Sequence, residues 1–362
     1  MKRQVLLFIF LFLFFKNVNA APYDIASIGT FGGYITEAYE INDKGQVAGW
    51  SYFPSGNMHA YMWDSTNGIK DLGVLYGEWS FGYGINDNSQ IVGSSTVTSS
   101  VLFPRHAYVW DSINGMVDIG TLGGDESHAH AINDLGQIAG FSNVSIGGNF
   151  HNAFIWDNVN GMRNLGTLGG NDIEAYGIND LGYVVGYSQT VNNQVHAFIW
   201  DAVTGMKDIG HLGGGASTAF SINENGIVVG CSTTTEGIGH AFLWGGVMRD
   251  LGTLGIRSDA QSINDLGYVV GYSRISSGVN HAFIWDSVNG MKDLNALIDS
   301  SSGWILEEAM DINNLGQIIG KGTLNGSNRA FLLTPTVQAT PEPSTMFLFM
   351  SGLLGLIKLK RM

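Results

Sequence analysis

The stretch Ala175-Tyr-Gly-Ile-Asn-Asp-Leu-Gly-Tyr-Val-Val-Gly-Tyr-Ser188 occurs in seven recognisable copies along the 362-residue chain. Each copy carries an Ile-Asn pair, followed by a glycine and an apolar run. The asparagines of these pairs are Asn42, Asn86, Asn133, Asn179, Asn223, Asn264 and Asn313, at intervals of 44, 47, 46, 44, 41 and 49 residues. Self-similarity at this period indicates a repeat architecture, and it decides the fold.

The quoted copy predicts two strands joined by a tight turn. In Asn179-Asp-Leu-Gly182 the first two residues favour the opening positions of a hairpin turn, and the glycine takes a positive φ. Residues 183–188 are apolar on both faces, so we expect this second strand to be buried on both. Gly186 inside it predicts the close approach of a neighbouring sheet.

Two further strands complete the repeat, His196–Trp200 and Met206–Gly210, with a hairpin turn between them. The chain holds 51 glycines and only 13% charged residues, as expected for many short strands joined by tight turns. Four strands in a unit of about 45 residues match a propeller blade, whereas a β-solenoid would use shorter coils. The sequence therefore predicts an all-β, seven-bladed β-propeller with four-stranded antiparallel blades.

The two ends of the repeat region complement each other. Residues 24–29 resemble the fourth strand of a unit that has no first three strands, and residues 329–333 resemble a third strand that has no fourth. We expect the N-terminal strand to complete the last blade, which would close the ring and hide two strand edges.

The chain ends carry targeting segments. Residues 1–20 have a basic start, an apolar run and a small-residue exit, which predicts a secretory signal peptide. Residues 341–362 hold Pro341-Glu342-Pro343, then a short apolar segment and a basic tail. As a helix, that apolar segment would reach only about 18 Å, short of the roughly 30 Å hydrocarbon core. The predicted division is thus a signal peptide (1–20), repeats (21–335), a short linker (336–340) and a sorting or membrane segment (341–362).

This C-terminal end resembles the PEP-CTERM sorting signal of Gram-negative bacteria, with Pro341, Glu342 and Pro343 as its sorting motif. The resemblance implies recognition by an exosortase, transient anchoring in the inner membrane by the C-terminal segment, and delivery to the cell surface or extracellular matrix. A simple C-terminal membrane anchor is the alternative.

The repeats resemble the HAF repeats of exported bacterial proteins, which are named for a His-Ala-Phe triplet. The triplet stands here at His196–Phe198, His240–Phe242 and His281–Phe283, and variants of it stand in the other units. The resemblance covers nearly all of residues 22–334. It implies export and a repeat structure, and it implies no reaction or ligand.

The charge of the chain restricts its partners. Between the two terminal segments lie 30 acidic and 11 basic residues, a net of −19, which repels nucleic acid. Cys231 is the only cysteine, so no intramolecular disulfide forms, and we expect it to be a buried small hydrophobe. No cofactor or metal is expected.

The recurrent histidines occur once per unit, too far apart around a ring to share a metal ion. We interpret them as structural, each hydrogen-bonded within its own blade, with the hairpin aspartate as partner, for example Asp180 for His196. A series of tryptophans at one strand position predicts core between the blades: Trp63, Trp110, Trp156, Trp200, Trp244 and Trp285.

Binding is expected where the repeat pattern fails. The pattern breaks at residues 74–81, 98–105 and 295–308, in loops that a propeller places in one sector of one face. These loops supply aromatic and charged side chains suited to stacking on sugars or gripping a protein. The candidate binding residues are Tyr76, Glu78, Trp79, Phe103, Arg105 and Trp304.

The sequence favours a non-enzymatic binding or scaffold protein that contacts polysaccharide or protein outside the cell. The alternatives are a polysaccharide hydrolase or lyase on a propeller scaffold, and a purely structural spacer. An enzyme would require converging acids, or a His and Tyr pair, in the central channel, and the sequence reveals no such cluster.

Overall fold

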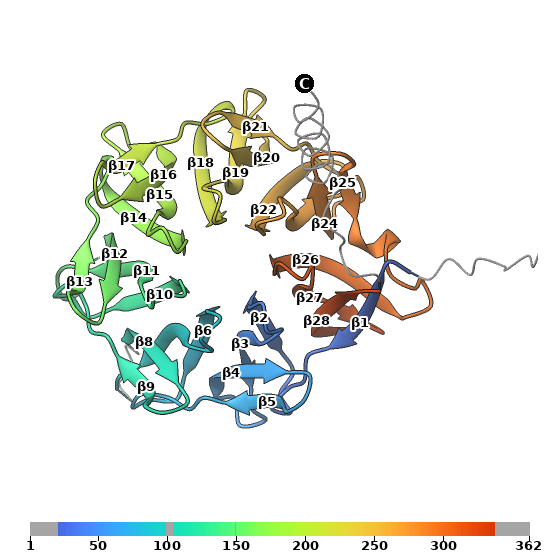
Figure 1. Cartoon of the computed structure of the whole chain (residues 1–362), viewed down its shortest axis with the longest axis horizontal. Helices are drawn as coiled ribbons and strands as arrows, with labels where there is room; N and C mark the ends of the chain where they lie inside the picture. The colour runs from blue at the N-terminus through green and yellow to red at the C-terminus, as the bar shows by residue number, and fades with distance from the viewer. Residues whose placement is uncertain (1–20, 99–103, 149, 337–362) are drawn as a thin grey trace, which may run out of the picture.

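A computed structural model describes residues 21–98, 104–148 and 150–336. These residues form seven four-stranded antiparallel sheets arranged as blades around a central axis (Figure 1). The prediction of an all-β, seven-bladed propeller is therefore confirmed. Apart from the strands, the described chain contains the short 3-10 helix η1 (Leu294–Ala296) between the last two blades. No helix of the described residues is long and apolar enough to cross a membrane.

The strands of each blade follow one another outward from the axis. The innermost strands are β2 (Thr36–Ile41), β6 (Ser80–Ile85), β10 (Ser127–Ile132), β14 (Gly169–Ile178), β18 (Gly213–Ile222), β22 (Arg257–Ile263) and β26 (Trp304–Ile312). The second strands are β3 (Val47–Tyr52), β7 (Ile91–Thr96), β11 (Ile138–Asn143), β15 (Val184–Thr190), β19 (Val228–Thr234), β23 (Val269–Arg274) and β27 (Ile318–Leu324). The third strands are β4 (Met58–Asp64), β8 (Arg105–Asp111), β12 (His151–Asp157), β16 (Val195–Asp201), β20 (Gly239–Trp244), β24 (Asn280–Asp286) and β28 (Ser327–Pro335). The outermost strands are β5 (Gly68–Asp71), β9 (Gly115–Asp118), β13 (Gly161–Asn164), β17 (Gly205–Asp208), β21 (Met248–Asp250), β25 (Gly290–Asp293) and β1 (Tyr23–Ser27). Blades 1 to 6 begin with β2, β6, β10, β14, β18 and β22, and blade 7 consists of β26, β27, β28 and β1.

The N-terminal strand closes the ring. Strand β1 pairs antiparallel with β28, from Tyr23 opposite Pro335 to Ser27 opposite Phe331 (Figure 1). Just past it, the Ile28 amide donates to the Ala330 carbonyl oxygen at 3.0 Å, as the Ile209 amide does to the Ala197 carbonyl oxygen in blade 4. The first strand of the chain therefore replaces the missing fourth strand of the last blade, as predicted.

The core lies between the blades. Between blades 4 and 5, Val185 and Ala197 pack with Ala219, Ile222 and Phe242, and each of these side chains is buried. Equivalent clusters fill the other interfaces of the described ring. The predicted tryptophans lie in or against these clusters: Trp63, Trp110, Trp156, Trp200, Trp244 and Trp285.

A β-bulge in each innermost strand explains the glycine of each second strand. In β14 the ladder shifts between Ala175 and Gly177, so that Tyr176 is the extra residue. A Cβ on Gly186 would lie 1.9 Å from the Glu174 carbonyl oxygen, an impossible contact. The predicted close approach at Gly186 is therefore real, but it comes from the bulged strand of the same sheet and not from a neighbouring sheet. The same contact occurs at the equivalent glycines: Gly49, Gly93, Gly140, Gly230, Gly271 and Gly320.

The Ile-Asn hairpins form two closed belts of hydrogen bonds around one end of the ring, which we call the hairpin end. In the first belt, the amide Nδ2 of each asparagine donates to the main-chain oxygen of its counterpart in the next blade, at 2.9–3.1 Å. In the second, the main-chain N–H of the following residue donates to a side-chain oxygen of the next blade, at 2.8–2.9 Å. Both belts return from Asn313 and Asn314 to blade 1. At the hairpin itself, Gly182 has the expected positive φ of 77°.

The recurrent histidines hold the two outer strands of their own blade together, but the predicted partner is wrong. His196 Nδ1 lies 2.6 Å from Asp208 Oδ2, at the end of β17. Asp180, the predicted partner, lies in the hairpin belt and accepts the Asp134 N–H. The other pairs are His59–Asp71, His106–Asp118, His240–Asp250 and His281–Asp293. In blade 3 both positions change together, to Asn152 and Asn164, which supports the pairing.

Deleting residues 21–30 should lower the melting temperature of the ring by about 10 °C or more, because β28 would lose its outer partner. Differential scanning calorimetry measures this change, and a synthetic peptide of residues 21–30 should restore part of it. An unchanged melting temperature would show that β1 does not close the ring.

Replacing Gly186 by alanine should destabilise the protein by about 1–3 kcal/mol, since the new Cβ would push against the Glu174 carbonyl. Gly29→Ala is the matched control, because its Cβ would meet Ile69 at an ordinary 3.7 Å. Urea unfolding of both variants tests the prediction, which fails if the two lose equal stability.

The His196→Ala variant should lose about 1 kcal/mol of unfolding free energy, a modest figure because Asp208 is partly exposed to solvent. The double variant His196→Asn/Asp208→Asn, which imitates blade 3, should lose less than His196→Ala. Thermal unfolding compares the two, and the reverse order would argue against a histidine–aspartate pair as the stabilising contact.

Candidate functional site in the central channel

The predicted binding residues lie in two separate places. Residues 76–79 wrap around Thr96 in blade 2, whose Oγ1 accepts the main-chain N–H groups of Glu78 and Trp79, while Tyr76 is 77% exposed. Arg105 opens β8, 3.4 Å from a Glu126 oxygen. Trp304 opens β26 in blade 7, where its ring meets Phe331 edge-on and packs against the blade core. Phe103 lies outside the described residues.

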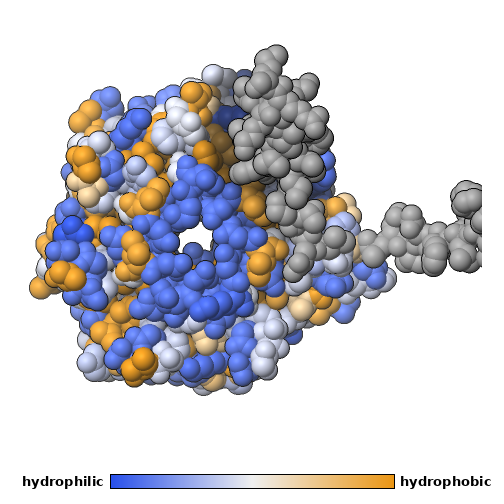
Figure 2. All heavy atoms as spheres, in the orientation of Figure 1, coloured by the Kyte–Doolittle hydropathy of each residue, from blue (hydrophilic) through white to orange (hydrophobic). Residues whose placement is uncertain are grey.

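The bulges aim a set of side chains at the axis of the ring. In each innermost strand the extra residue stands unpaired, and a bulge re-aims such a side chain. Together these residues line a cavity of about 420 Å³ in the central channel. We call them the collar: Tyr39, Tyr83, His130, Tyr176, Phe220, Gln261 and Met310. Figure 2 shows that the hole through the ring is open and bordered by hydrophilic residues.

Five collar residues form a continuous aromatic arc across blades 1 to 5. Neighbouring ring centroids are 5.3 Å apart for Tyr39 and Tyr83, 5.6 Å for Tyr83 and His130, 5.1 Å for His130 and Tyr176, and 5.6 Å for Tyr176 and Phe220. Burial raises the pKa of Tyr83 to about 12 and lowers the pKa of His130 to about 4. The arc is therefore uncharged at neutral pH and presents ring faces, hydroxyls and an imidazole to the channel.

Two carboxyl groups lie in the channel wall where blades 7 and 1 adjoin. Glu40 Oε2 accepts the Ile85 N–H of the next blade at 2.7 Å. Asp311 accepts the Ile41 N–H at 2.8 Å and the Ser262 hydroxyl at 2.5 Å. Burial raises the pKa of Glu40 well above its usual range, with a contribution from the charge of Asp311. Burial raises the pKa of Asp311 as well.

These two acids are specific to blades 7 and 1. The equivalent positions of the other blades carry small residues: Gly84, Ala131, Gly177, Ser221 and Ser262. The structure thus contains both a pair of acids and a His beside Tyr in the channel, and the expectation that no such cluster exists is wrong.

Below the collar, the acidic side chains of the second belt surround the channel mouth at the hairpin end, next to a cavity of about 370 Å³. They are Asp43, Asp87, Asp134, Asp180, Glu224 and Asp265, with Asn314 in the seventh position. Each accepts a main-chain N–H from the preceding blade, and Asn314 Nδ2 also donates to Asp43 and Asp265 at 3.0 Å. These bonds offset the repulsion among carboxylates that the ring brings together.

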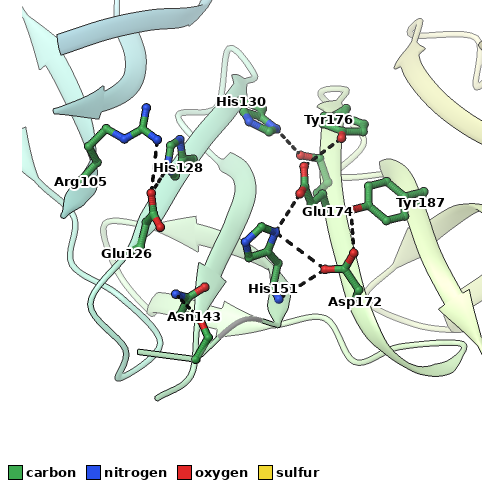
Figure 3. A network of polar contacts seen from close by, with 12 residues as sticks. Arg105, Glu126, His128, His130, Asn143, His151, Asp172, Glu174, Tyr176 and Tyr187 are labelled. Carbon is green, nitrogen blue, oxygen red and sulfur yellow. Dashed lines mark hydrogen bonds and ion pairs between the residues drawn. The ribbon is translucent and has the colours of Figure 1, made fainter. Parts of the chain in front are cut away.

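At the opposite end, which we call the upper end, a polar network links the collar to blades 3 and 4 (Figure 3). Glu174 accepts the Tyr176 hydroxyl at 2.8 Å and lies 2.8 Å from His151 Nδ1. Asp172 accepts the Tyr187 hydroxyl at 3.1 Å. The hydrogen bond with Glu174 raises the pKa of His151. The network fixes the phenol of Tyr176 at the top of the arc.

Sequence reasoning missed the collar, although a signal for it is present. Ala175 and Ile178 are both core residues, three positions apart, whereas a regular strand alternates with a period of two. This spacing recurs in the repeats and indicates a bulge. Two variable positions lie between these core residues, and the first of them is the collar residue.

Comparisons with known proteins support the C-terminal sorting signal and the propeller fold. The model of the PEP-CTERM protein-sorting motif matches residues 339–361, which lie outside the described residues. Among curated proteins no match is found. Solved propellers are similar to the chain at low identity.

The β-propeller domain of the Trilobed protease from Pyrococcus furiosus is 15% identical over 73% of this chain and 84% of that one, with a TM-score of 0.51. TolB from Acinetobacter baumannii is 12% identical over 81% of this chain, which spans 64% of the length of TolB, with a TM-score of 0.47. The BP39L lectin from Burkholderia pseudomallei is 8% identical over 89% of this chain and 98% of that one, with a TM-score of 0.47.

The likeness to the protease domain shows the propeller fold and nothing about activity. The sorting motif implies an exported protein that an exosortase recognises, with a stage in which the C-terminal segment is held in the membrane. The chain is therefore an exported seven-bladed β-propeller protein with a PEP-CTERM sorting motif at its C-terminal end.

Proposed function

We propose that this protein is a non-enzymatic binding propeller of the cell surface or extracellular matrix, and that it holds a polysaccharide in its central channel. One observation carries the proposal: the bulges gather five aromatic rings around a cavity of about 420 Å³. Sugar rings stack on aromatic faces, and the hydroxyls of Tyr39, Tyr83 and Tyr176 are suited to hydrogen bonds with sugar hydroxyls.

A chain of aromatic contacts extends from the channel toward the upper end of blades 1 and 2. Tyr83 stacks near Phe81 at 6.2 Å, Phe81 meets Trp50 at 5.6 Å, and Trp50 meets Tyr52 at 5.6 Å. This sector is where Tyr76, Glu78, Trp79 and Arg105 lie. We propose that these loop residues contact the polysaccharide outside the channel, while Trp304, packed on Phe331, supports blade 7.

The proposed export route depends on signals at both ends of the chain. Residues 1–20 act as a signal peptide, residues 21–335 form the exported HAF-repeat body, residues 336–340 link it to the tail, and residues 341–362 carry the sorting signal with Pro341, Glu342 and Pro343. The sorting-motif match over residues 339–361 supports the last of these segments.

A polysaccharide hydrolase is the second candidate, favoured by Glu40 and Asp311. Their pKa values are raised in one channel wall, and glycoside hydrolysis uses a pair of carboxyl groups with separated pKa values. Both side chains, however, are engaged by main-chain N–H groups of adjoining blades, a role that fits structural bonding between blades.

A glycan array probed with the mature ring should show binding to at least one polysaccharide class. Tyr83→Ala and Tyr176→Ala should each weaken that binding about tenfold, because each removes a stacking face from the arc. Trp79→Ala should weaken binding to long chains more than binding to short oligosaccharides. Val203→Ala, at an exposed outer hairpin turn, is the control.

Reducing-end release from the bound polysaccharide separates the alternatives. Binding without release supports the proposal, whereas release that disappears in Glu40→Gln would establish the hydrolase. A ring that binds no glycan on the array would contradict both and favour a structural spacer.

A further inference from the structure

We infer that the channel selects a sugar carrying a free ammonium group, that is, an amino sugar without an N-acetyl group. The inference rests on the proposed function and names its ligand class. It follows from three features of the channel: two carboxyl side chains without an ion pair, an aromatic arc beside them, and the absence of lysine and arginine from the described channel lining.

The two carboxylates lie in the cavity wall without a counter-charge. Among the described residues, neither Glu40 nor Asp311 forms an ion pair, and their partners are two main-chain N–H groups and the Ser262 hydroxyl. Burial and the nearby Asp311 charge raise the pKa of Glu40, so ionising both acids is unfavourable unless a cation is present. A bound ammonium group would supply that cation and donate hydrogen bonds to both side chains.

The propeller itself does not require these acids. Blades 2 to 6 form the same bulge and the same hairpin with Gly84, Ala131, Gly177, Ser221 and Ser262 in the equivalent position. The acids therefore make one wall of an otherwise repeated channel chemically different. Asp311 follows Met310 and accepts the Ser262 hydroxyl, where the aromatic arc is interrupted, whereas Glu40 follows Tyr39, the first ring of the arc.

The aromatic arc suits the same ligand. The faces of tyrosine and phenylalanine rings attract a cation, and carboxylates combined with aromatic walls are the usual environment for organic ammonium groups. His130 adds no competing charge, because burial lowers its pKa to about 4. The arc can thus stack on the sugar ring while the acids receive its ammonium group.

The negative electrostatic potential around the channel excludes acidic polysaccharides. No lysine or arginine lines the collar cavity or the hairpin-end cavity of the described ring. The hairpin-end mouth carries Asp43, Asp87, Asp134, Asp180, Glu224 and Asp265. A uronate or sulfated chain would be repelled along the channel, whereas a cationic one would be drawn into it.

Isothermal titration calorimetry of the mature ring at neutral pH, with three probes, tests the inference. The probes are a glucosamine tetramer, the matching N-acetylglucosamine tetramer, and spermidine, which carries ammonium groups without a sugar. We expect the glucosamine tetramer to bind at least about tenfold more tightly than either of the others.

The Glu40→Gln/Asp311→Asn variant should lose this preference, while keeping the shape of the channel and the acceptor oxygens for the main-chain N–H groups. Glu236→Gln, on an exposed loop far from the channel lining, should keep it. Melting temperatures show whether each variant is folded. If the double variant does not fold, the preference of the unmodified protein among the probes still decides.

Each other outcome has a distinct meaning. Equal or tighter binding of the acetylated tetramer would overturn the inference and leave the proposed polysaccharide binding intact. Spermidine binding as tight as the glucosamine tetramer would overturn the assignment to an amino sugar, because charge alone would then suffice. Failure of all glycans on the array would overturn the proposed function itself.

Discussion

The whole ring depends on one short hydrogen bond repeated between blades, from an asparagine amide to the main-chain oxygen of the next asparagine. A single such bond contributes only about 1 kcal/mol. In a closed belt, however, no blade can tilt or slide without stretching the bonds on both of its sides. The belt thereby fixes the distance of the innermost strands from the axis of the ring. It therefore also fixes the width of the channel between side chains that face the axis from opposite blades.

A second constraint works inside each blade, where a glycine permits a bulge and the bulge frees one position from the core. In blade 4 the core residues Ala175 and Ile178 are anchored on both sides of Tyr176, and Gly186 leaves room for the displaced carbonyl of Glu174. The frame is nearly identical in each repeat, so the residue it carries can change without loss of packing. Tyrosine, histidine, phenylalanine, glutamine and methionine all occupy this position.

Much of the fold was predictable because it follows from local sequence. The period of the Ile-Asn pairs predicts the blades, and the orphan strand at residues 23–27 predicts its own partner. The site was not predictable in the same way. The bulge interrupts the two-residue alternation from which strand faces are predicted. In the sequence, Tyr176 therefore appears to be one more core residue. Glu40 and Asp311 are 271 residues apart and meet only because the ring closes. The histidine partner was missed for a simpler reason: Asp180 and Asp208 are both near His196 in sequence, and only the pairing of β16 with β17 distinguishes them.

The place where the ring closes is also the place where the chain leaves it. The Thr336 amide donates to the Pro22 carbonyl oxygen at 3.0 Å, so the two ends of the described body meet beside the β1–β28 pair. The sorting motif begins three residues later in the sequence. While the tail is held in a membrane, a force on the body is transmitted first to β28, whose hydrogen-bonded neighbours in the sheet are β27 and the non-covalently docked β1. The mechanical strength of the tethered protein is therefore set by the non-covalent pairing of β1 with β28 in blade 7. The other six blades, each formed from one continuous segment of the chain, do not set it.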